Sequence, residues 1–292
     1  MPADLNPYQR ALLEWSDRTR RDLPWRRTRD PWAVLVSELM LQQTQVARVV
    51  PKYHAFLDRF PTPASCAAAP AGDVVRAWAG LGYNRRALNL HGAAKACVER
   101  HDGALPTTLA ELLALPGIGP YTARAVLAFA RNADVGVLDT NAARVTARVA
   151  GSRLDARTAQ ATADAAVPIG RGWVWNQAIL DLGATVCTKR VLRCEACPVA
   201  PHCAWHVAGH PAPDPADGSA GTSGRQSTYA GSDRQGRGRL VDALRIAPVH
   251  TDDLAATMGW PDDPRRAQRV AATLLSDGLA VVDVGGSLAL PG

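Results

Sequence analysis

Four closely spaced cysteines constrain this chain more than any other feature of its sequence. Six cysteines occur in 292 residues, and four of them fall within 17 residues, in the spacing C-x6-C-x2-C-x5-C, as Cys187, Cys194, Cys197 and Cys203. Such crowding differs from a dispersed disulfide framework, and four thiolates at this spacing can close around one metal centre in a reducing compartment. The spacing alone leaves structural zinc and an iron-sulfur cluster as open alternatives.

The composition is that of a folded protein with room for more than one domain, because 47% of the residues are hydrophobic. No apolar run approaches the roughly 20 residues of a membrane helix, and the N-terminus lacks a signal-peptide pattern, so we expect a cytoplasmic protein with no membrane partner. A net charge of +6 is compatible with a polyanionic partner. The two remaining cysteines, Cys66 and Cys97, are expected to be ordinary buried thiols.

Helical patterns broken by Pro and Gly extend from residue 5 to about 207 and predict a mainly α fold. The start of one helix is well marked, since Asp30 can cap it and Pro31 suits its first position. Residues 208–226 are rich in Pro, Gly, Ala, Ser and Asp, which predicts a flexible linker.

Beyond this linker, residues 238–290 predict three helices and then a hairpin around Gly285 and Gly286. That order is typical of a small winged-helix module, which we place at residues 227–292. Such a module serves either nucleic-acid binding or protein contacts, and the sequence leaves both open.

A second motif, "LPGIGPYTARAV" at residues 115–126, joins two predicted helices through a glycine-rich hairpin. Gly117 and Gly119 would let a phosphate approach backbone N-H groups of the hairpin, and the dipole of the next helix favours an anion. The same turn is also a common plain connector between helices.

Two carboxylates lie in contrasting local patterns. Asp139 precedes a helix, where it is either a simple cap or a carboxylate kept ionised by the helix terminus. Glu38 projects from a largely apolar helix face, where burial should raise its pKa, unless it only bonds to a neighbouring segment. An acid and an anion of this kind suit cleavage of a glycosidic bond through an oxocarbenium-like state.

An ordered set of motifs resembles one family. The segments "LPWR" (23–26), "SELMLQQTQV" (37–46), "GLGY" (80–83), the glycine hairpin and the cysteine loop are similar to those of the MutY-type adenine DNA glycosylases, in the endonuclease III or helix-hairpin-helix superfamily. The resemblance covers about residues 8–206. It implies a fold made of a six-helix barrel and an iron-sulfur cluster domain, with the four cysteines holding a 4Fe-4S cluster.

The resemblance also implies a division of the chain and roles for single residues. The catalytic core would be residues 1–207, with the six-helix part at about 28–135 and the cluster part at 1–27 plus 136–207. Glu38 would protonate the adenine at N7, Asp139 would stabilise the sugar cation, and Asn141 and Tyr121 would orient these groups. The implied contacts to substrate and DNA are Trp25, Arg26, Leu41, Gln42, Gln43, Thr44, Tyr83, Gly117 and Gly119. Of these, Gln43 and Tyr83 would be wedge residues that fill the gap left when the target base leaves the stack. Ordinary packing is the alternative for the pocket and wedge positions.

The implied activity is excision of adenine mispaired with 8-oxoguanine or guanine in double-stranded DNA during base excision repair, by a nucleoid-associated monomer. Tyr121 stands where bifunctional relatives carry a Schiff-base lysine, so we expect a monofunctional enzyme. A mismatch thymine or uracil glycosylase and a non-catalytic DNA-damage-binding protein are the alternatives.

The chain departs from the family pattern at Asn84, at Thr140 and above all in its tail. Many relatives carry a MutT-like domain of over a hundred residues that recognises 8-oxoguanine, and the roughly 65 residues after the linker are too few for one. Arg234, Arg237 and Arg239 would be available to phosphate there. The resemblance therefore predicts a short form with weaker discrimination between 8-oxoguanine and guanine.

Overall fold

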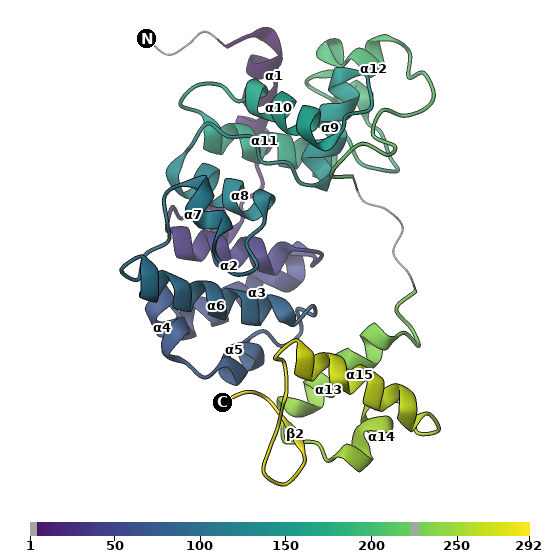
Figure 1. The fold of residues 1–292 in the computed structure, drawn as a ribbon. Coiled ribbons are helices and arrows are strands. Elements are labelled where there is room, and N and C mark those ends of the chain that lie inside the picture. Colours follow the sequence, from purple (N-terminus) through teal and green to yellow (C-terminus); the bar gives the residue numbers. More distant parts are fainter. Residues whose placement is uncertain (1–4, 223–227) are drawn as a thin grey trace. The chain divides into compact units, whose positions relative to one another are not determined.

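The computed structural model describes residues 5–222 and 228–292, and helices dominate it (Figure 1). The prediction of a mainly α chain is confirmed. Contacts divide the chain into two compact units, Met1–Val34 with Gly119–Arg225, and Leu35–Ile118 with Gln226–Gly292. The predicted boundaries at 28, 135 and 207 stay a prediction. Within the described residues, the structure contains no helix that is both long and apolar enough to cross a membrane.

The first unit is organised around one apolar helix. Its elements are α1 (Pro7–Thr19), the 3-10 turn η1 (Pro24–Arg26), α8 (Pro120–Arg131), α9 (Thr140–Ala150), α10 (Ala156–Ala166), α11 (Gly172–Thr185), η2 (Cys194–Ala196), η3 (Ala200–His202) and α12 (Ala204–Val207). Helix α11 packs against α1, α8 and α9. Leu12, Val145, Trp175 and Leu182 meet in its core, so the cysteine loop that follows α11 starts from a firmly packed helix.

The second unit combines the helices after α2 (Pro31–Leu41) with the C-terminal module. Its first part contains α3 (Val46–Arg59), α4 (Pro63–Ala68), α5 (Ala71–Ala77), α6 (Arg85–Arg100) and α7 (Leu109–Leu113). Helix α6 packs against α4 and α5. The rings of Phe56 and Trp78 pack edge to face with centroids 5.9 Å apart, and both side chains are fully buried. Cys66 and Cys97 are buried in the same unit, as predicted.

The C-terminal module has the predicted order of three helices and a hairpin. Its elements are α13 (Asp233–Leu244), η4 (Thr251–Asp253), α14 (Leu254–Met258), α15 (Pro264–Ser276), β1 (Val281–Val282) and β2 (Leu288–Ala289). The antiparallel pair β1-β2 gains a third partner, because Val249 and Leu288 exchange two backbone hydrogen bonds of 2.8 Å. Gly236 on α13 packs so close to Trp260 that a Cβ atom would lie 2.1 Å from the indole, so this position requires glycine.

Residues 208–222 do not form the flexible linker that their composition predicts. Asp214 accepts hydrogen bonds of 2.6 and 3.1 Å from the guanidinium of Arg148, and the Ala220 N-H donates to the carbonyl of Leu154 at 2.9 Å. The side chain of Ser219 is buried. Small residues and prolines pack here directly against other parts of the first unit, which composition alone does not reveal. The rest of the predicted linker, residues 223–226, lies outside the described residues.

Candidate functional site

Glu38 is buried on helix α2, as predicted. The helix starts where expected, because the carboxylate of Asp30 accepts bonds from the N-H groups of Trp32 and Ala33 at 3.2 and 3.1 Å. Glu38 is 4% exposed, and the flanking residues of the helix, Val34 to Met40, are buried as well. The burial of Glu38 is as predicted, and its protonation state stays a prediction.

Asp139 caps helix α9. Its Oδ1 accepts from the N-H groups of Asn141 and Ala142 at 2.8 and 2.7 Å, and its Oδ2 accepts from the Asn141 amide at 3.0 Å. Burial nevertheless raises the pKa of Asp139 above its ordinary value, although these bonds and the charge of Arg144 act to lower it. Desolvation of this carboxyl thus acts against its hydrogen bonds, and the predicted ionised state of Asp139 stays a prediction.

Arg144, which no sequence motif marks, connects Asp139 to the cysteine loop. Its guanidinium donates to the Asn141 Oδ1 at 2.9 Å, to the Gly183 carbonyl at 2.6 Å and to the Cys187 carbonyl at 2.8 Å. A Cβ atom on Gly183 would lie 2.7 Å from the Asn141 carbonyl oxygen, so α11 and α9 can approach this closely only at a glycine. Asn141 is thus held on both sides of its amide, which supports the predicted orienting role.

Tyr121 is the second residue of α8 and is half-buried. The hairpin before it is closed by a hydrogen bond of 3.2 Å from the Ile118 N-H to the Leu115 carbonyl. Gly117 has φ of +71°, and a Cβ atom there would lie 2.4 Å from the Asn89 side chain. Within the described residues, the N-H groups of Gly117 and Gly119 make no hydrogen bond, which leaves them available for the predicted phosphate contact.

The two predicted wedge residues share an unusual backbone conformation. Gln43 and Tyr83 have φ of +53° and +46°, in the left-handed region that residues other than glycine rarely adopt. Tyr83 is 43% exposed, and Gln43 is also exposed. Strain of this kind persists only where the surroundings enforce it, and it concentrates at functional sites.

Arg86 enforces both turns, and the sequence reasoning missed it. From α6 its guanidinium donates to carbonyl oxygens at the end of α2 and in the turn after it, those of Leu39, Met40 and Gln42, at 2.5 to 3.1 Å. It also donates to the carbonyls of Leu81 and Gly82, at 3.2 and 3.0 Å. Thr44 bridges the same turns, since its hydroxyl accepts from Arg86 at 3.2 Å and donates to the Leu81 carbonyl at 3.3 Å. Burial lowers the pKa of Arg86 to about 10, still well above neutral pH.

Trp25 and Arg26, predicted in the base pocket, are both buried in the turn η1. Arg26 forms a two-pronged ion pair with Asp181 of α11 at 2.7 and 2.8 Å, and Arg21 binds the same carboxylate at 2.5 Å. This geometry favours the packing alternative for Arg26. Leu41, half-buried, is the last residue of α2, and a substrate contact by Leu41, Gln42 or Trp25 stays a prediction.

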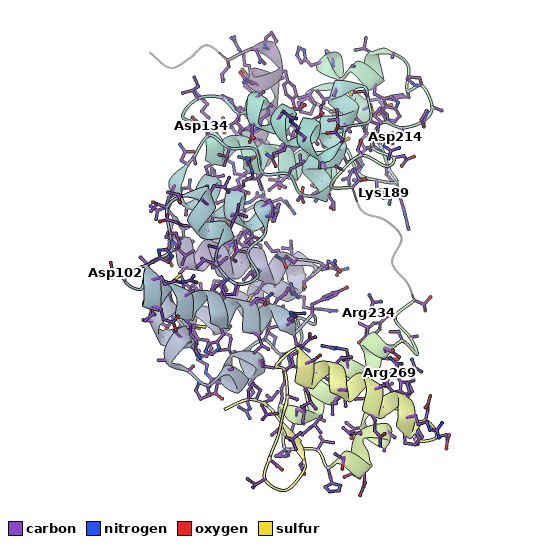
Figure 2. The ribbon with its side chains drawn as sticks, viewed as in Figure 1. Asp102, Asp134, Lys189, Asp214, Arg234 and Arg269 are labelled. Carbon is purple, nitrogen blue, oxygen red and sulfur yellow. The ribbon has the colours of Figure 1, made fainter. Side chains whose placement is uncertain are left out.

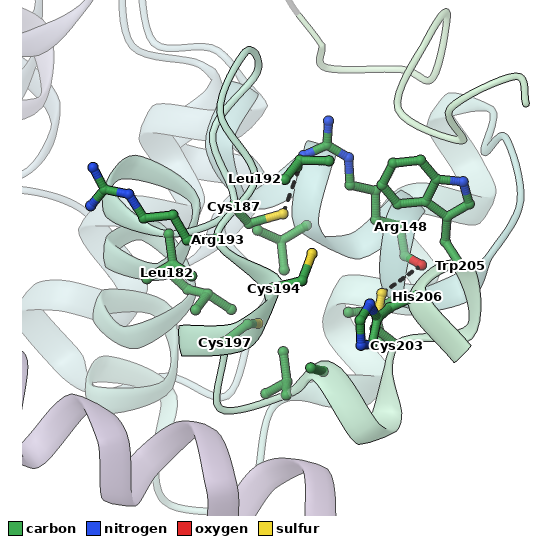
Figure 3. A pocket seen from close by; sticks show the side chains of 15 residues that line it. Arg148, Leu182, Cys187, Leu192, Arg193, Cys194, Cys197, Cys203, Trp205 and His206 are labelled. Carbon is green, nitrogen blue, oxygen red and sulfur yellow. Dashed lines mark hydrogen bonds between the residues drawn. The ribbon is translucent and has the colours of Figure 1, made fainter. Parts of the chain in front are cut away.

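The four predicted cysteine ligands line one pocket of the first unit, together with Arg148, Trp205 and His206 (Figure 3). The guanidinium of Arg148 donates a hydrogen bond to the Cys187 sulfur, with 3.2 Å between Nη1 and Sγ. The Cys203 thiol donates to the Arg148 carbonyl at 3.2 Å. Burial, together with the neighbouring thiols, raises the pKa of Cys197 to about 11. A cationic metal core would offset this cost by stabilising the thiolates.

The arrangement of the four sulfurs bears on which metal centre they could hold. Within the described chain, no three of the four cysteine sulfurs lie within 4.8 Å of one another. A tetrahedral zinc site with bonds near 2.3 Å would need sulfurs about 3.8 Å apart. Four thiolates that line one pocket can also bind a multi-iron core, in which each thiolate binds a different iron. His206 and His210 flank Cys194, with the His210 Nε2 3.6 Å from its sulfur, and neither histidine was selected from the sequence.

Helices, glycine hairpin and cysteine pocket together define a DNA glycosylase of the helix-hairpin-helix class. Residues 36–169 match the family described as HhH-GPD superfamily base excision DNA repair protein. In structure the chain is similar to a thermostable thymine-DNA glycosylase (28% identity, 69% of this chain, 95% of the other, TM-score 0.66). An endonuclease III trapped on DNA, at 20% identity and TM-score 0.60 over 70% of this chain and 95% of that one, shares the fold.

Sequence relatives narrow the class to one family. An adenine DNA glycosylase of Mycolicibacterium smegmatis is 43% identical, over 96% of this chain and 95% of its own length. That of Mycobacterium tuberculosis is 42% identical, over 96% and 92%. The human adenine DNA glycosylase is 40% identical over 69% of this chain, which matches 40% of the human length. The chain belongs to the adenine DNA glycosylase family.

Proposed function

We propose that this protein excises adenine from double-stranded DNA where the adenine is mispaired with 8-oxoguanine or guanine. The observation that carries the proposal is a pair of carboxyls in a chain of this family: Glu38, buried on an apolar helix, and Asp139, half-buried at a helix start. Adenine is a poor leaving group as an anion, and protonation by Glu38 at N7 removes that charge.

Asp139 then stabilises the sugar cation, and its own geometry supports this role. The Asn141 amide and two backbone N-H groups fix the orientation of the carboxylate, and Arg144 fixes Asn141 in turn. A carboxylate held in place needs little reorganisation as positive charge develops on the sugar. After the base has left, Glu38 carries no proton and can accept one from the attacking water.

The four cysteines would hold a 4Fe-4S cluster, and their position around one pocket of the first unit supports this. The cluster would cross-link the loop at residues 187–203. It would provide neither an acid nor a base for cleavage of the glycosidic bond. Arg148 and Arg144 would tie this loop to α9 and so to the residues around Asp139.

The reaction would stop at base removal. A strand-nicking glycosylase uses a lysine amine as nucleophile, and helix α8 carries Tyr121 in place of one. Only three lysines, Lys52, Lys95 and Lys189, occur in the chain. Borohydride trapping of a stoichiometric covalent complex that disappears with one lysine substitution would contradict this part of the proposal.

One assay tests the proposed reaction: base excision from duplexes with adenine opposite 8-oxoguanine, guanine or thymine, with and without hot alkali. We expect excision opposite the first two bases, and strand breaks only after alkali. A duplex with thymine opposite guanine tests the alternative of a thymine glycosylase, the activity named for one structurally similar protein. Glu38→Gln and Asp139→Asn should lose excision and retain DNA binding. Full excision by both variants would point to a different site.

A further inference from the structure

A large basic groove lies inside the second unit, between the wedge turns and the C-terminal module. Its volume is about 880 Å³. The turns at residues 42–43 and 81–84 line it on one side, and Tyr229, Arg234 and Arg237 line it on the other. Among the described residues that line the groove, five are arginines (Arg48, Arg85, Arg86, Arg234 and Arg237) and none is acidic.

The module is seated on the rest of this unit by specific polar contacts. Arg245 of α13 donates to the Asn84 side chain at 2.8 Å and to the Val75 carbonyl at 3.1 Å. The Gly72 N-H donates to the Pro291 carbonyl at 2.7 Å, and a Cβ atom on Gly72 would lie 2.6 Å from that oxygen. The two walls of the groove are therefore joined, and they can act on one ligand together.

Asp277 fixes two of the groove arginines without lining the groove itself. It pairs with Arg85 at 3.1 Å and with Arg237 at 2.8 Å, and these arginines come from α6 and α13. One carboxylate between two guanidiniums leaves a net positive charge. Arg48, on the first turn of α3, is exposed and forms no ion pair with the residues that the structure describes. The groove thus presents more positive charge than the protein neutralises.

The aromatic residue at the groove adds a second kind of contact. Tyr229 is 52% exposed, and the guanidinium of Arg234 lies 5.4 Å from its ring centroid. Arginines with an exposed aromatic ring are the combination that proteins use for the backbone and the stacked bases of a nucleic-acid strand. Arg234 lies at the start of α13, and Arg269 lies on α15 of the same module (Figure 2).

We propose that this groove binds the sugar-phosphate backbone of the strand opposite the excised adenine, so that the C-terminal module forms part of the DNA site. The proposal rests on the proposed function, which makes Gln43 and Tyr83 the residues beside the vacated position of the duplex. Both line the groove, whereas Glu38 does not. The groove is therefore assigned to the strand that faces the cleaved nucleotide, because it is lined by the wedge residues and not by the proposed acid.

Equilibrium binding of the full chain tests the proposal. The probe is a labelled duplex that carries an abasic-site analogue opposite guanine, titrated at several salt concentrations. Arg48→Ala and Arg234→Ala should each weaken binding roughly tenfold, as expected for loss of a charged hydrogen bond, and lower the salt slope by about 1. Arg265→Ala is the matched control, since Arg265 is exposed on α15 of the same module and lies outside the groove. Arg48 lies on α3, outside the C-terminal module, so its replacement leaves the fold of the module intact.

Neutral methylphosphonates identify the strand. Placed around the base opposite the abasic site, they should remove the difference between wild type and Arg48→Ala or Arg234→Ala. The proposal is wrong if the difference in affinity disappears only with methylphosphonates in the other strand. It is also wrong if Arg265→Ala weakens binding while both groove variants bind normally. Adenine excision by the wild type is measured separately. Its failure would reject the proposed function, whereas normal binding by both groove variants would reject the groove.

Discussion

The guanidinium of Arg144 donates to the Asn141 Oδ1 at 2.9 Å, while the Asn141 amide donates to the Asp139 Oδ2 at 3.0 Å. The same guanidinium reaches the Cys187 carbonyl at 2.8 Å. Arg144 and Asn141 thus connect the first cysteine of the loop with the carboxyl that we place at the sugar. A change at either end of this connection should be felt at the other.

Arg144→Lys should slow excision, because one ammonium cannot reach Asn141, Gly183 and Cys187 in the geometry of a planar guanidinium. We expect a loss of roughly 10- to 100-fold, as found for residues that orient groups at a reactive site. Single-turnover excision measures it. Arg124→Lys is the control, since Arg124 pairs with Asp164 in the same unit at 2.6 Å. An unchanged rate in Arg144→Lys would separate the cysteine loop from the proposed chemistry.

Asp139→Asn should stabilise the protein while it removes activity. Burial raises the pKa of Asp139 in the folded state, so ionisation of this carboxyl favours the unfolded chain. Below the unfolded value, near 4, both states are protonated and the effect is absent. As pH rises above that value, the wild type loses stability and the amide variant does not. Urea unfolding of both proteins between pH 4 and 8 should show an advantage of Asp139→Asn that grows with pH. A constant difference would mean that the carboxyl is not perturbed.

Asp181→Asn should have the opposite pH dependence. Burial acts to raise the pKa of Asp181, but Arg26 and Arg21 more than offset it, and the pKa is lowered overall. Its contribution to stability is therefore present above the ordinary value near 4 and is lost as pH falls through the lower folded value. Removing one charge of this buried pair should cost roughly 3–5 kcal/mol at pH 7. Asp17→Asn, at an exposed pair with Arg20, should change the free energy of unfolding by less than about 1 kcal/mol.

Arg86→Met should loosen both wedge turns, because it leaves a set of buried carbonyl oxygens without donors. We expect a loss of at least about 2 kcal/mol in stability. Hydrogen exchange should become faster at residues 41–44 and 80–84, and affinity for duplex DNA should fall. Arg100→Met, at the exposed end of the same helix α6, controls for loss of an arginine. Unchanged exchange in both turns would show that other contacts hold them.

Local signals in the sequence were sufficient for much of the fold. Asp30 and Pro31 start α2, Asp139 caps α9, and the helix order of the C-terminal module is as the pattern indicated. Each of these features depends on residues a few positions apart, which is the range over which propensity and periodicity carry information.

The missed features depend on distant partners. Arg86 binds a carbonyl 47 residues away, and Arg26 binds a carboxylate 155 residues away. An arginine on a predicted helix reads as a solvent-exposed charge until its acceptors are known. The segment at residues 208–222 shows the same limit, since Asp214 acquires its role only from Arg148, 66 residues earlier in the chain. The direction of the Asp139 pKa also depended on tertiary burial, which the cap pattern does not contain.

The contacts of Arg86 have an electrostatic consequence as well as a mechanical one. In the part of the chain that the structure describes, its hydrogen bonds go to carbonyl and hydroxyl oxygens and to no carboxylate. Such acceptors satisfy the donors without cancelling the charge. A full positive charge therefore remains fixed beneath Gln43 and Tyr83 in a low-dielectric setting, where its potential is weakly screened. The residue that shapes the two turns also creates a permanent attraction for polyanions at the same place.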